Sequence, residues 1–315
     1  MPHPPFHCPN CHQPLSTHQL AMTCRSCRAT YPVRHGIPQL LHPRFMDSFK
    51  ESEQHFHDEL SASATNRSIA SRSSRFHNRF KQPMMELPLG SAVLEVACGT
   101  RVDGVEIAAA GQSATALDIS PDAVVQAQSL VRQVGLEGRL RLAVSDAEHL
   151  PFSDRVFDAT FVAASFHHFP NQLSALLEMR RVTKPGGLVI FGVEPQAWPY
   201  RTLYRWLGPL KRYIRRRQYR MYNSVADDST EGYTEPQLRE LFRRADLEIQ
   251  EVSPAKLLSE CYDSSVRLLQ RLLRRQLHPW AWLDHRLADV DAGLERLPGI
   301  SKLFWHWNVI SRVPV

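Results

Sequence analysis

The chain has 315 residues, of which 43% are hydrophobic and 22% charged, and its formal net charge is +6 at pH 7. This composition is typical of a globular protein, and the length allows one large domain with appendages or two domains. The N-terminus lacks the basic and apolar regions of a signal peptide, and no apolar run is long enough for a membrane span. We therefore expect a cytoplasmic protein without a transmembrane segment, whose cysteines are metal ligands or free thiols rather than disulfides.

Residues 1–43 contain two Cys-x₂-Cys pairs, and twelve residues separate the pairs. The pairs are Cys8 with Cys11 and Cys24 with Cys27. Four thiolates at this spacing can close a tetrahedral site, and the pattern predicts a zinc ribbon. Because the protein would supply all four ligands, the zinc is expected to be structural, and so small a segment should fold only with its metal.

The rest of the chain divides into a polar section and an alternating section. Residues 44–90 are polar and serine-rich with scattered aromatic side chains, and we expect loosely packed helices that act as a linker or lid. From residue 91 the pattern predicts strands at 92–97, 114–117, 140–144, 157–163 and 188–193, and helices at 102–110, 121–134 and 173–182. A turn is expected at 184–187. Strands separated by helices predict a parallel sheet with right-handed crossovers and helices on both faces.

The segment 92–100 and the later Asp118 are the most informative part of the chain. A buried strand ends in a turn of small residues, a helix follows, and the next strand ends at Asp118, 19 residues beyond Gly99. A carboxylate about 20 residues after such a turn is where nucleoside-binding units contact the ribose hydroxyls. Taken alone, Asp118 could instead cap the helix that begins at Pro121.

The positive charge is concentrated in one segment. Between residues 195 and 226 there is no acidic residue, and eight basic ones occur at 201, 205, 211, 212, 215, 216, 217 and 220. Apolar residues recur at helical spacing among them. Such a segment suits a membrane surface, a nucleic acid or an anionic substrate, although a solvated helix face packed on the core is the commonest outcome. We interpret 201–220 as a lid and as a candidate for peripheral membrane contact.

The C-terminal part is predicted to be mostly helical. We expect an amphipathic helix at 234–245, a strand at 247–252, helices within 257–297 and a last strand at 303–313.

Six motifs follow one another in residues 91–195. They are Val-Leu-Glu-Val-Ala-Cys-Gly-Thr, Leu-Asp-Ile-Ser, Val-Ser-Asp-Ala-Glu-His-Leu-Pro-Phe, Phe-Asp-Ala-Thr-Phe, Phe-His-His-Phe and Arg-Val-Thr-Lys-Pro-Gly-Gly. With them the chain resembles the class I S-adenosylmethionine-dependent methyltransferases, most closely the small-molecule group that includes quinone-biosynthesis enzymes. The resemblance implies an α/β fold with a Rossmann-like seven-stranded sheet and helices on both faces, in a domain of residues 91–315 with helical insertions at 196–226 and 257–297. The N-terminal ribbon resembles the small zinc proteins that activate methyltransferases.

The resemblance also implies which residues bind S-adenosylmethionine. The methionine part would be contacted from Glu95, Ala97, Gly99, Thr100, Ala163 and Ser165, the ribose from Asp118, and the adenine from Ile119, Asp146 and Ala147. Arg101 stands where the family pattern has its third glycine. Because of that departure, a degenerate protein of this fold that serves as a non-catalytic scaffold is a further alternative.

The activity implied by the resemblance is methyl transfer to a small-molecule or lipid-like acceptor. An RNA methyltransferase that binds RNA through the zinc ribbon and the basic segment is the alternative. Because a sulfonium methyl is already activated, in-line displacement requires alignment and exclusion of water. No catalytic residue is therefore assigned. His167 or His168 could act as a general base, and a purely structural role is an equally good interpretation.

Overall fold

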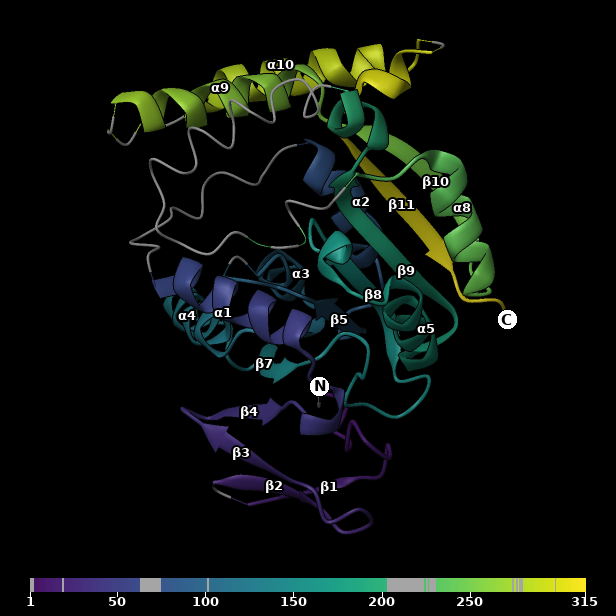
Figure 1. Cartoon of the computed structure of the whole chain (residues 1–315). Coiled ribbons are helices and arrows are strands. Elements are labelled where there is room, and N and C mark those ends of the chain that lie inside the picture. The colour runs from purple at the N-terminus through teal and green to yellow at the C-terminus, as the bar shows by residue number, and fades with distance from the viewer. Residues whose placement is uncertain are drawn as a thin grey trace.

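The computed structural model describes residues 3–18, 20–62, 75–100, 102–202, 224, 226, 231–273, 275, 277, 280–297 and 299–315. A twisted sheet runs through the molecule (Figure 1), and seven of its strands have the order β7-β6-β5-β8-β9-β11-β10. The strands are β5 (Ala92–Val96), β6 (Ser113–Asp118), β7 (Leu140–Ser145), β8 (Phe157–Ala163), β9 (Thr183–Pro195), β10 (Glu248–Ala255) and β11 (His306–Arg312). The first five are parallel, whereas β11 runs antiparallel to both β9 and β10. The predicted seven-stranded Rossmann-like sheet is confirmed.

Helices cover both faces of this sheet, as predicted. One face carries α5 (Gln172–Val182) and α8 (Glu235–Arg244), and the other carries α2 (Arg75–Met85), α3 (Gly104–Ala109) and α4 (Pro121–Gln133). Neighbouring side chains of β5 point to opposite faces of the sheet. Leu94 packs in the core on the side of α5 and α8, and Val93 packs in the core on the side of α2 and α3. The start of α4 follows its sequence signal, because the Ser120 side chain accepts the N–H of Ala123 and a proline takes the first helical position.

The turn predicted at 184–187 lies inside β9. Thr183 pairs with Phe157 and Leu188 pairs with Ala159, so the residues between them form a bulge in the strand. Gly186 has a φ of +74°, a conformation that glycine adopts without strain. The glycine of this segment therefore forms a bulge, and the strand continues on both sides of it.

The N-terminal strands extend the sheet, which the sequence did not predict. The strands β1 (Leu15–Thr17), β2 (Ala21–Cys24), β3 (Thr30–Arg34) and β4 (Ile37–Leu40) form an antiparallel meander, and β4 pairs in parallel with β7. Phe6 packs against Phe152, and the Arg141 guanidinium lies 3.8 Å from the centre of the Phe6 ring. These N-terminal strands therefore dock on the parallel sheet and cover an edge that would otherwise expose unpaired backbone groups.

The remaining helices lie at the margins of the sheet. After a short turn of 3₁₀ helix, η1 (Pro43–Phe45), α1 (Ser48–Ala62) packs beside α4, and α9 (Leu258–Leu273) pairs with α10 (Ala281–Leu294) at one end of the molecule (Figure 1). Two further 3₁₀ turns, η3 (Phe166–His168) and η4 (Ile300–Leu303), follow β8 and precede β11. Most of the basic segment and Arg101 lie outside the described residues. No helix in the described part of the chain is long and apolar enough to cross a membrane.

Candidate functional site

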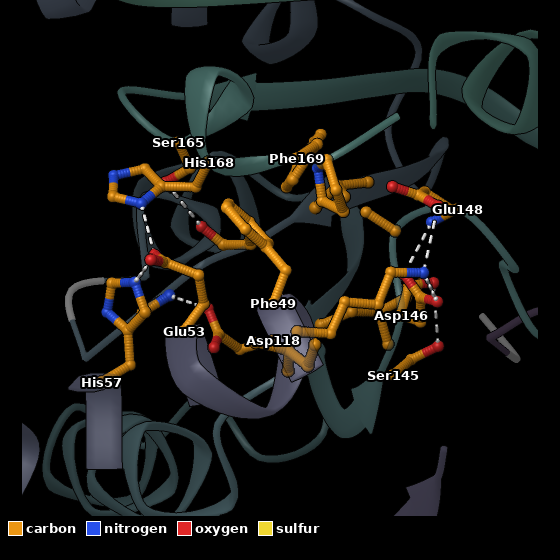
Figure 2. Close-up of a pocket in the computed structure, with 18 residues that line it drawn as sticks. Phe49, Glu53, His57, Asp118, Ser145, Asp146, Glu148, Ser165, His168 and Phe169 are labelled. Atoms are coloured by element: carbon orange, nitrogen blue, oxygen red, sulfur yellow. Dashed lines mark hydrogen bonds and ion pairs between the residues drawn. The ribbon is translucent and has the colours of Figure 1, made fainter. Parts of the chain in front are cut away.

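A pocket opens where the carboxyl ends of β5, β6, β7 and β8 meet α1 (Figure 2). This edge of a parallel sheet is where α/β proteins bind their ligands. Seven of the ten residues predicted for the cofactor line the pocket, and these are Ala97, Gly99, Asp118, Ile119, Asp146, Ala147 and Ser165. Glu95, Thr100 and Ala163 are not among the lining residues.

The turn after β5 has the shape that a close ligand approach requires. Ala97 and Gly99 have φ values of +56° and +58°. For alanine this left-handed conformation costs about 1–2 kcal/mol, and such strain is concentrated at functional sites. The Gly99 N–H donates to Asp118 Oδ2 at 2.7 Å, and the Ser120 N–H donates to Oδ1 at 2.9 Å. These bonds fix the Asp118 carboxylate at the wall of the pocket.

Glu95 supports the turn from behind. Its carboxylate is buried and accepts the N–H groups of Asp103 at 3.0 Å and Gly104 at 2.7 Å. Gly104 is the first residue of α3, so the carboxylate caps the positive end of that helix. Glu95 thus lies behind the turn and outside the lining of the pocket.

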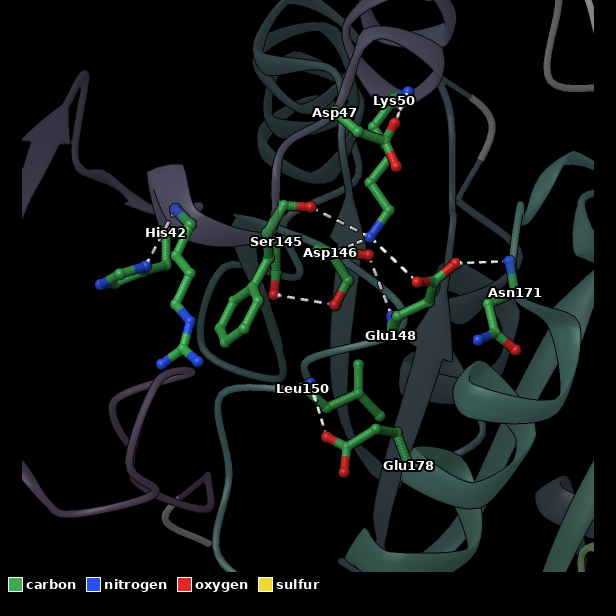
Figure 3. Close-up of polar contacts among 11 residues, drawn as sticks. His42, Asp47, Lys50, Ser145, Asp146, Glu148, Leu150, Asn171 and Glu178 are labelled. Atoms are coloured by element: carbon green, nitrogen blue, oxygen red, sulfur yellow. Dashed lines mark hydrogen bonds and ion pairs between the residues drawn. The ribbon is translucent and has the colours of Figure 1, made fainter.

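Asp146 is held by a lysine from α1 (Figure 3). Lys50 Nζ lies 2.7 Å from Asp146 Oδ2 and 3.0 Å from Glu148 Oε2, and it also donates to the Phe45 carbonyl oxygen. The three charged side chains are 5%, 8% and 10% exposed. Burial alone would lower the pKa of Lys50, but the hydrogen bonds to the two carboxylates outweigh it and raise that pKa. These ion pairs therefore hold α1 against the pocket.

A second link joins α1 to the end of β8. Glu53 Oε2 lies 2.9 Å from His168 Nδ1, and the same carboxylate accepts the Ser224 hydroxyl and the Ala226 N–H. Burial raises the pKa of Glu53, but the bond to His168 outweighs it, and the pKa falls below its usual value. The carboxylate is thus ionised at neutral pH, and it orients an imidazole that lines the pocket (Figure 2).

The neighbouring His167 has a different environment. Its Nδ1 lies 3.0 Å from Oε2 of Glu194, a fully buried residue of β9 whose carboxylate also accepts the N–H groups of Ser165 and Phe166. Burial would raise the pKa of Glu194, but His167 and these N–H groups lower it. His167 is not in the pocket lining, so the structure separates the two histidines that the sequence could not distinguish.

Sequence reasoning missed the contribution of α1. Phe49, Lys50, Glu53 and His57 all line the pocket, yet residues 44–90 were interpreted only as a linker or lid. The available signal was a cluster of charged and aromatic residues in a polar segment. That signal does not say which distant carboxylate or imidazole each side chain meets.

The four N-terminal cysteines converge as the spacing predicted. All four Sγ atoms lie within 4.8 Å of one another, and the pairs Cys8–Cys27 and Cys11–Cys24 are each 3.5 Å apart. A tetrahedral zinc with Zn–S bonds of 2.3 Å places sulfurs about 3.8 Å apart. The Tyr31 hydroxyl lies 3.2 Å from Cys8 Sγ and could support a thiolate ligand. The donor set fits a structural zinc ion.

Residues 94–191 match the family described as "Methyltransferase domain". The demethylmenaquinone methyltransferase of Geobacillus kaustophilus (strain HTA426) is 29% identical over 194 residues, which are 58% of this chain and 82% of that protein. The enzyme of the same name from Mycobacterium tuberculosis (strain ATCC 25618 / H37Rv) is 32% identical over 126 residues, covering 40% of this chain and 50% of that one.

Two solved structures show the same fold at 19% identity. The [4+2]-cyclase SpnF has a TM-score of 0.54, with 90% of this chain and 100% of that one covered. Phosphoethanolamine N-methyltransferase 2 of Haemonchus contortus has a TM-score of 0.50, with 88% and 62% covered. These likenesses concern the fold alone. The domain match and the curated relatives show that residues 94–191 form a methyltransferase domain of the S-adenosylmethionine-dependent type.

Proposed function

We propose that this enzyme methylates a small, lipid-like aromatic acceptor of the quinol type, which enters the pocket beneath α1. The observation that carries this proposal is the pocket lining. Phe49, Val96, Leu117, Phe169 and Pro170 give it apolar walls that suit a flat apolar ring. The names of the curated relatives, demethylmenaquinone methyltransferases, point to the same class of acceptor.

The cofactor is proposed to lie along the turn after β5. Ala97 and Gly99 would pass their backbone along it, Asp118 would accept the ribose hydroxyls, and Asp146 would face the adenine. The fit rests on the lining positions of these residues and on the fixed carboxylate of Asp118. When bound, S-adenosylmethionine supplies an activated methyl group, and the residues around it align the acceptor and exclude water. The roles of Glu95, Thr100, Ile119, Ala147, Ala163 and Ser165 remain proposals of the same kind.

His168 is proposed to be the proton acceptor. With Nδ1–H donating to Glu53, the imidazole carries its lone pair on Nε2. His168 would take the proton of an acceptor hydroxyl, which raises electron density in the aromatic ring. A ring carbon would then gain the methyl group as the methyl–sulfur bond breaks. The hydrogen of that carbon would move as a proton to the hydroxyl oxygen, so that the proton on His168 is the one released to solvent. Glu53 is a positioning residue, because it contacts Nδ1 and thereby fixes the orientation of the ring.

The charge of the pocket supports a small acceptor over RNA. Among the described residues that line it, four carboxylates belong to Glu53, Asp118, Asp146 and Glu148, and the one lysine is already paired with two of them. RNA phosphates require an excess of positive charge, which this lining does not offer. We further propose that residues 1–43 are a zinc-stabilised ribbon with zinc in a structural role, that 44–90 are a helical linker or lid whose second helix, α2, packs on the sheet, and that 91–315 are the catalytic domain.

The proposal is tested by transfer of a labelled methyl group to reduced demethylmenaquinone and, separately, to cellular RNA. We expect label in the lipid extract, and a decrease in rate of about 10²–10⁴-fold for His168→Asn. The exposed His35→Asn, at a position with a φ of 54° that asparagine tolerates, is the matched control. Label in RNA but not in lipid, or an unchanged rate for His168→Asn, would refute the corresponding part of the proposal.

A further inference from the structure

The hairpin formed by α9 and α10 is firmly anchored at one end. The fully buried Asp291 on α10 accepts the N–H groups of Leu258 at 2.8 Å and Ser259 at 3.1 Å, and thereby caps the first turn of α9. Arg79 on α2 donates to Glu295 at 2.8 Å, directly after α10. This base is therefore fixed to the body of the protein, and the opposite end of the hairpin projects beyond the sheet (Figure 1).

The helix α9 differs from an ordinary amphipathic helix, because several of its leucines face the solvent. Its covered side mixes polar and apolar residues. Ser259 and Glu260 are buried, and the half-buried residues are Tyr262, Asp263, Val266 and Gln270. Its leucines at 268, 269 and 273 are exposed. A helix on a globular protein normally turns its apolar side inward. An outward row of leucines has a binding role more often than a structural one.

The exposed leucines lie at the projecting end, where two tryptophans join them. Trp280 and Trp282 are 63% and 64% exposed, and their rings stack with centroids 6.3 Å apart. We name the exposed Leu268, Leu269 and Leu273 together with Trp280 and Trp282 the hairpin tip. Exposed tryptophan beside leucine is the combination that favours the interface between lipid headgroups and acyl chains.

The charge of this part of the chain is strictly positive. Between Asp263 and Asp284 the sequence has no acidic residue and has arginines at 267, 271, 274 and 275, and Arg275 is exposed in the structure. Each basic residue near an anionic bilayer contributes about 1 kcal/mol of attraction. A two-fold dimer through the tip would instead bring like charges of the two copies, Arg275 among them, into one interface.

We propose that the hairpin tip docks this methyltransferase on the surface of an anionic lipid bilayer. The exposed tryptophans and leucines enter the interfacial region, and the exposed Arg275 remains at the level of the headgroups. This surface differs from the segment 201–220 that the sequence suggested for membrane contact. The proposal goes beyond the proposed function and does not depend on it, because membrane binding is measured without any methyl acceptor.

The test is flotation of the full-length protein with vesicles of phosphatidylglycerol and phosphatidylcholine, compared with vesicles of phosphatidylcholine alone. We expect binding to the anionic vesicles that weakens as salt rises, and a loss of about tenfold or more in the partition coefficient for the double variant Trp280→Ala/Trp282→Ala. Trp198→Ala is the matched control, because Trp198 is 50% exposed and lies outside the hairpin. Both variants should keep the thermal stability of the parent protein, since they remove exposed side chains.

Three results would overturn the proposal. The first is that the protein fails to float with anionic vesicles at low salt. The second is that the double tryptophan variant floats as well as the parent protein. The third is that the parent protein is a dimer by sedimentation and the double variant a monomer, which would assign the tip to a second copy of the chain.

Discussion

The buried cluster of Lys50, Asp146 and Glu148 gives a quantitative test of how α1 is held. Replacing the lysine by methionine keeps most of its length and removes the charge that lies 2.7 and 3.0 Å from two buried carboxylates. Breaking a buried pair by removing one partner costs about 3–5 kcal/mol, because the remaining charge is left uncompensated. Here two carboxylates remain, so the upper half of that range applies unless α1 swings outward and lets water reach them.

The free energy of unfolding is measured by urea titration of the parent protein and of Lys50→Met. The triple variant Lys50→Met/Asp146→Asn/Glu148→Gln is the control, since it removes the stranded charges as well as the lysine. We expect the triple variant to recover most of the lost stability, as neutral replacements of buried ion pairs often do. A loss below about 1 kcal/mol for Lys50→Met, or a triple variant no more stable than the single one, would contradict the view that these ion pairs latch α1.

Three further predictions concern acid, burial and metal. Glu194→Gln should reduce stability at pH 7 by about 2 kcal/mol, because the buried carboxylate takes part in four hydrogen bonds, and urea titration measures this loss. The Glu194 pKa is lowered by folding, so its contribution exists above the unfolded value of about 4.3 and disappears as the pH falls further. Burial lowers the pKa of His306 from 6.5 to about 4, so the folded state loses up to about 3 kcal/mol relative to the unfolded state as the pH falls through that window. Thermal melts should show this loss, and His306→Phe should remove it; a melting profile of the same slope in the variant would exclude His306 as its cause. Metal analysis should find one zinc ion per chain, and Cys24→Ser should abolish its binding and lower the melting temperature; a metal-free protein that melts at the same temperature would refute the zinc site.

Local patterns predicted the catalytic sheet well. The buried run of β5, the small residues after it and the acid at the end of β6 are close in sequence, and their spacing reflects one βαβ unit. The N-cap at Ser120 and the four cysteines follow from equally local rules, and the structure agrees with them. Such features can be predicted from sequence spacing alone, because the residues that interact are neighbours or belong to one short structural unit.

Contacts between distant segments could not be predicted in the same way. Lys50 precedes Asp146 by 96 residues, and nothing near either one indicates the ion pair. The pairing of β4 with β7 depends on an open sheet edge that is known only once the sheet is assembled. His167 and His168 are adjacent, yet their roles differ because one meets Glu194 of β9 and the other meets Glu53 of α1. The side of α9 that faces outward is likewise decided by what the rest of the protein covers.

Binding of S-adenosylmethionine tests the central claim most directly. Asp118→Asn keeps the shape of the side chain but removes the charge that accepts two backbone N–H groups and faces the proposed ribose position. The exposed Asp122→Asn, on the first turn of α4, is the matched control. Titration calorimetry of the parent protein and Asp122→Asn should show one site of the same affinity, and Asp118→Asn should bind about tenfold or more weakly, since hydrogen bonds to a charged group contribute about 1.5–3 kcal/mol. Absence of binding by the parent protein, or equal affinity of Asp118→Asn, would contradict the assignment of this pocket to the cofactor.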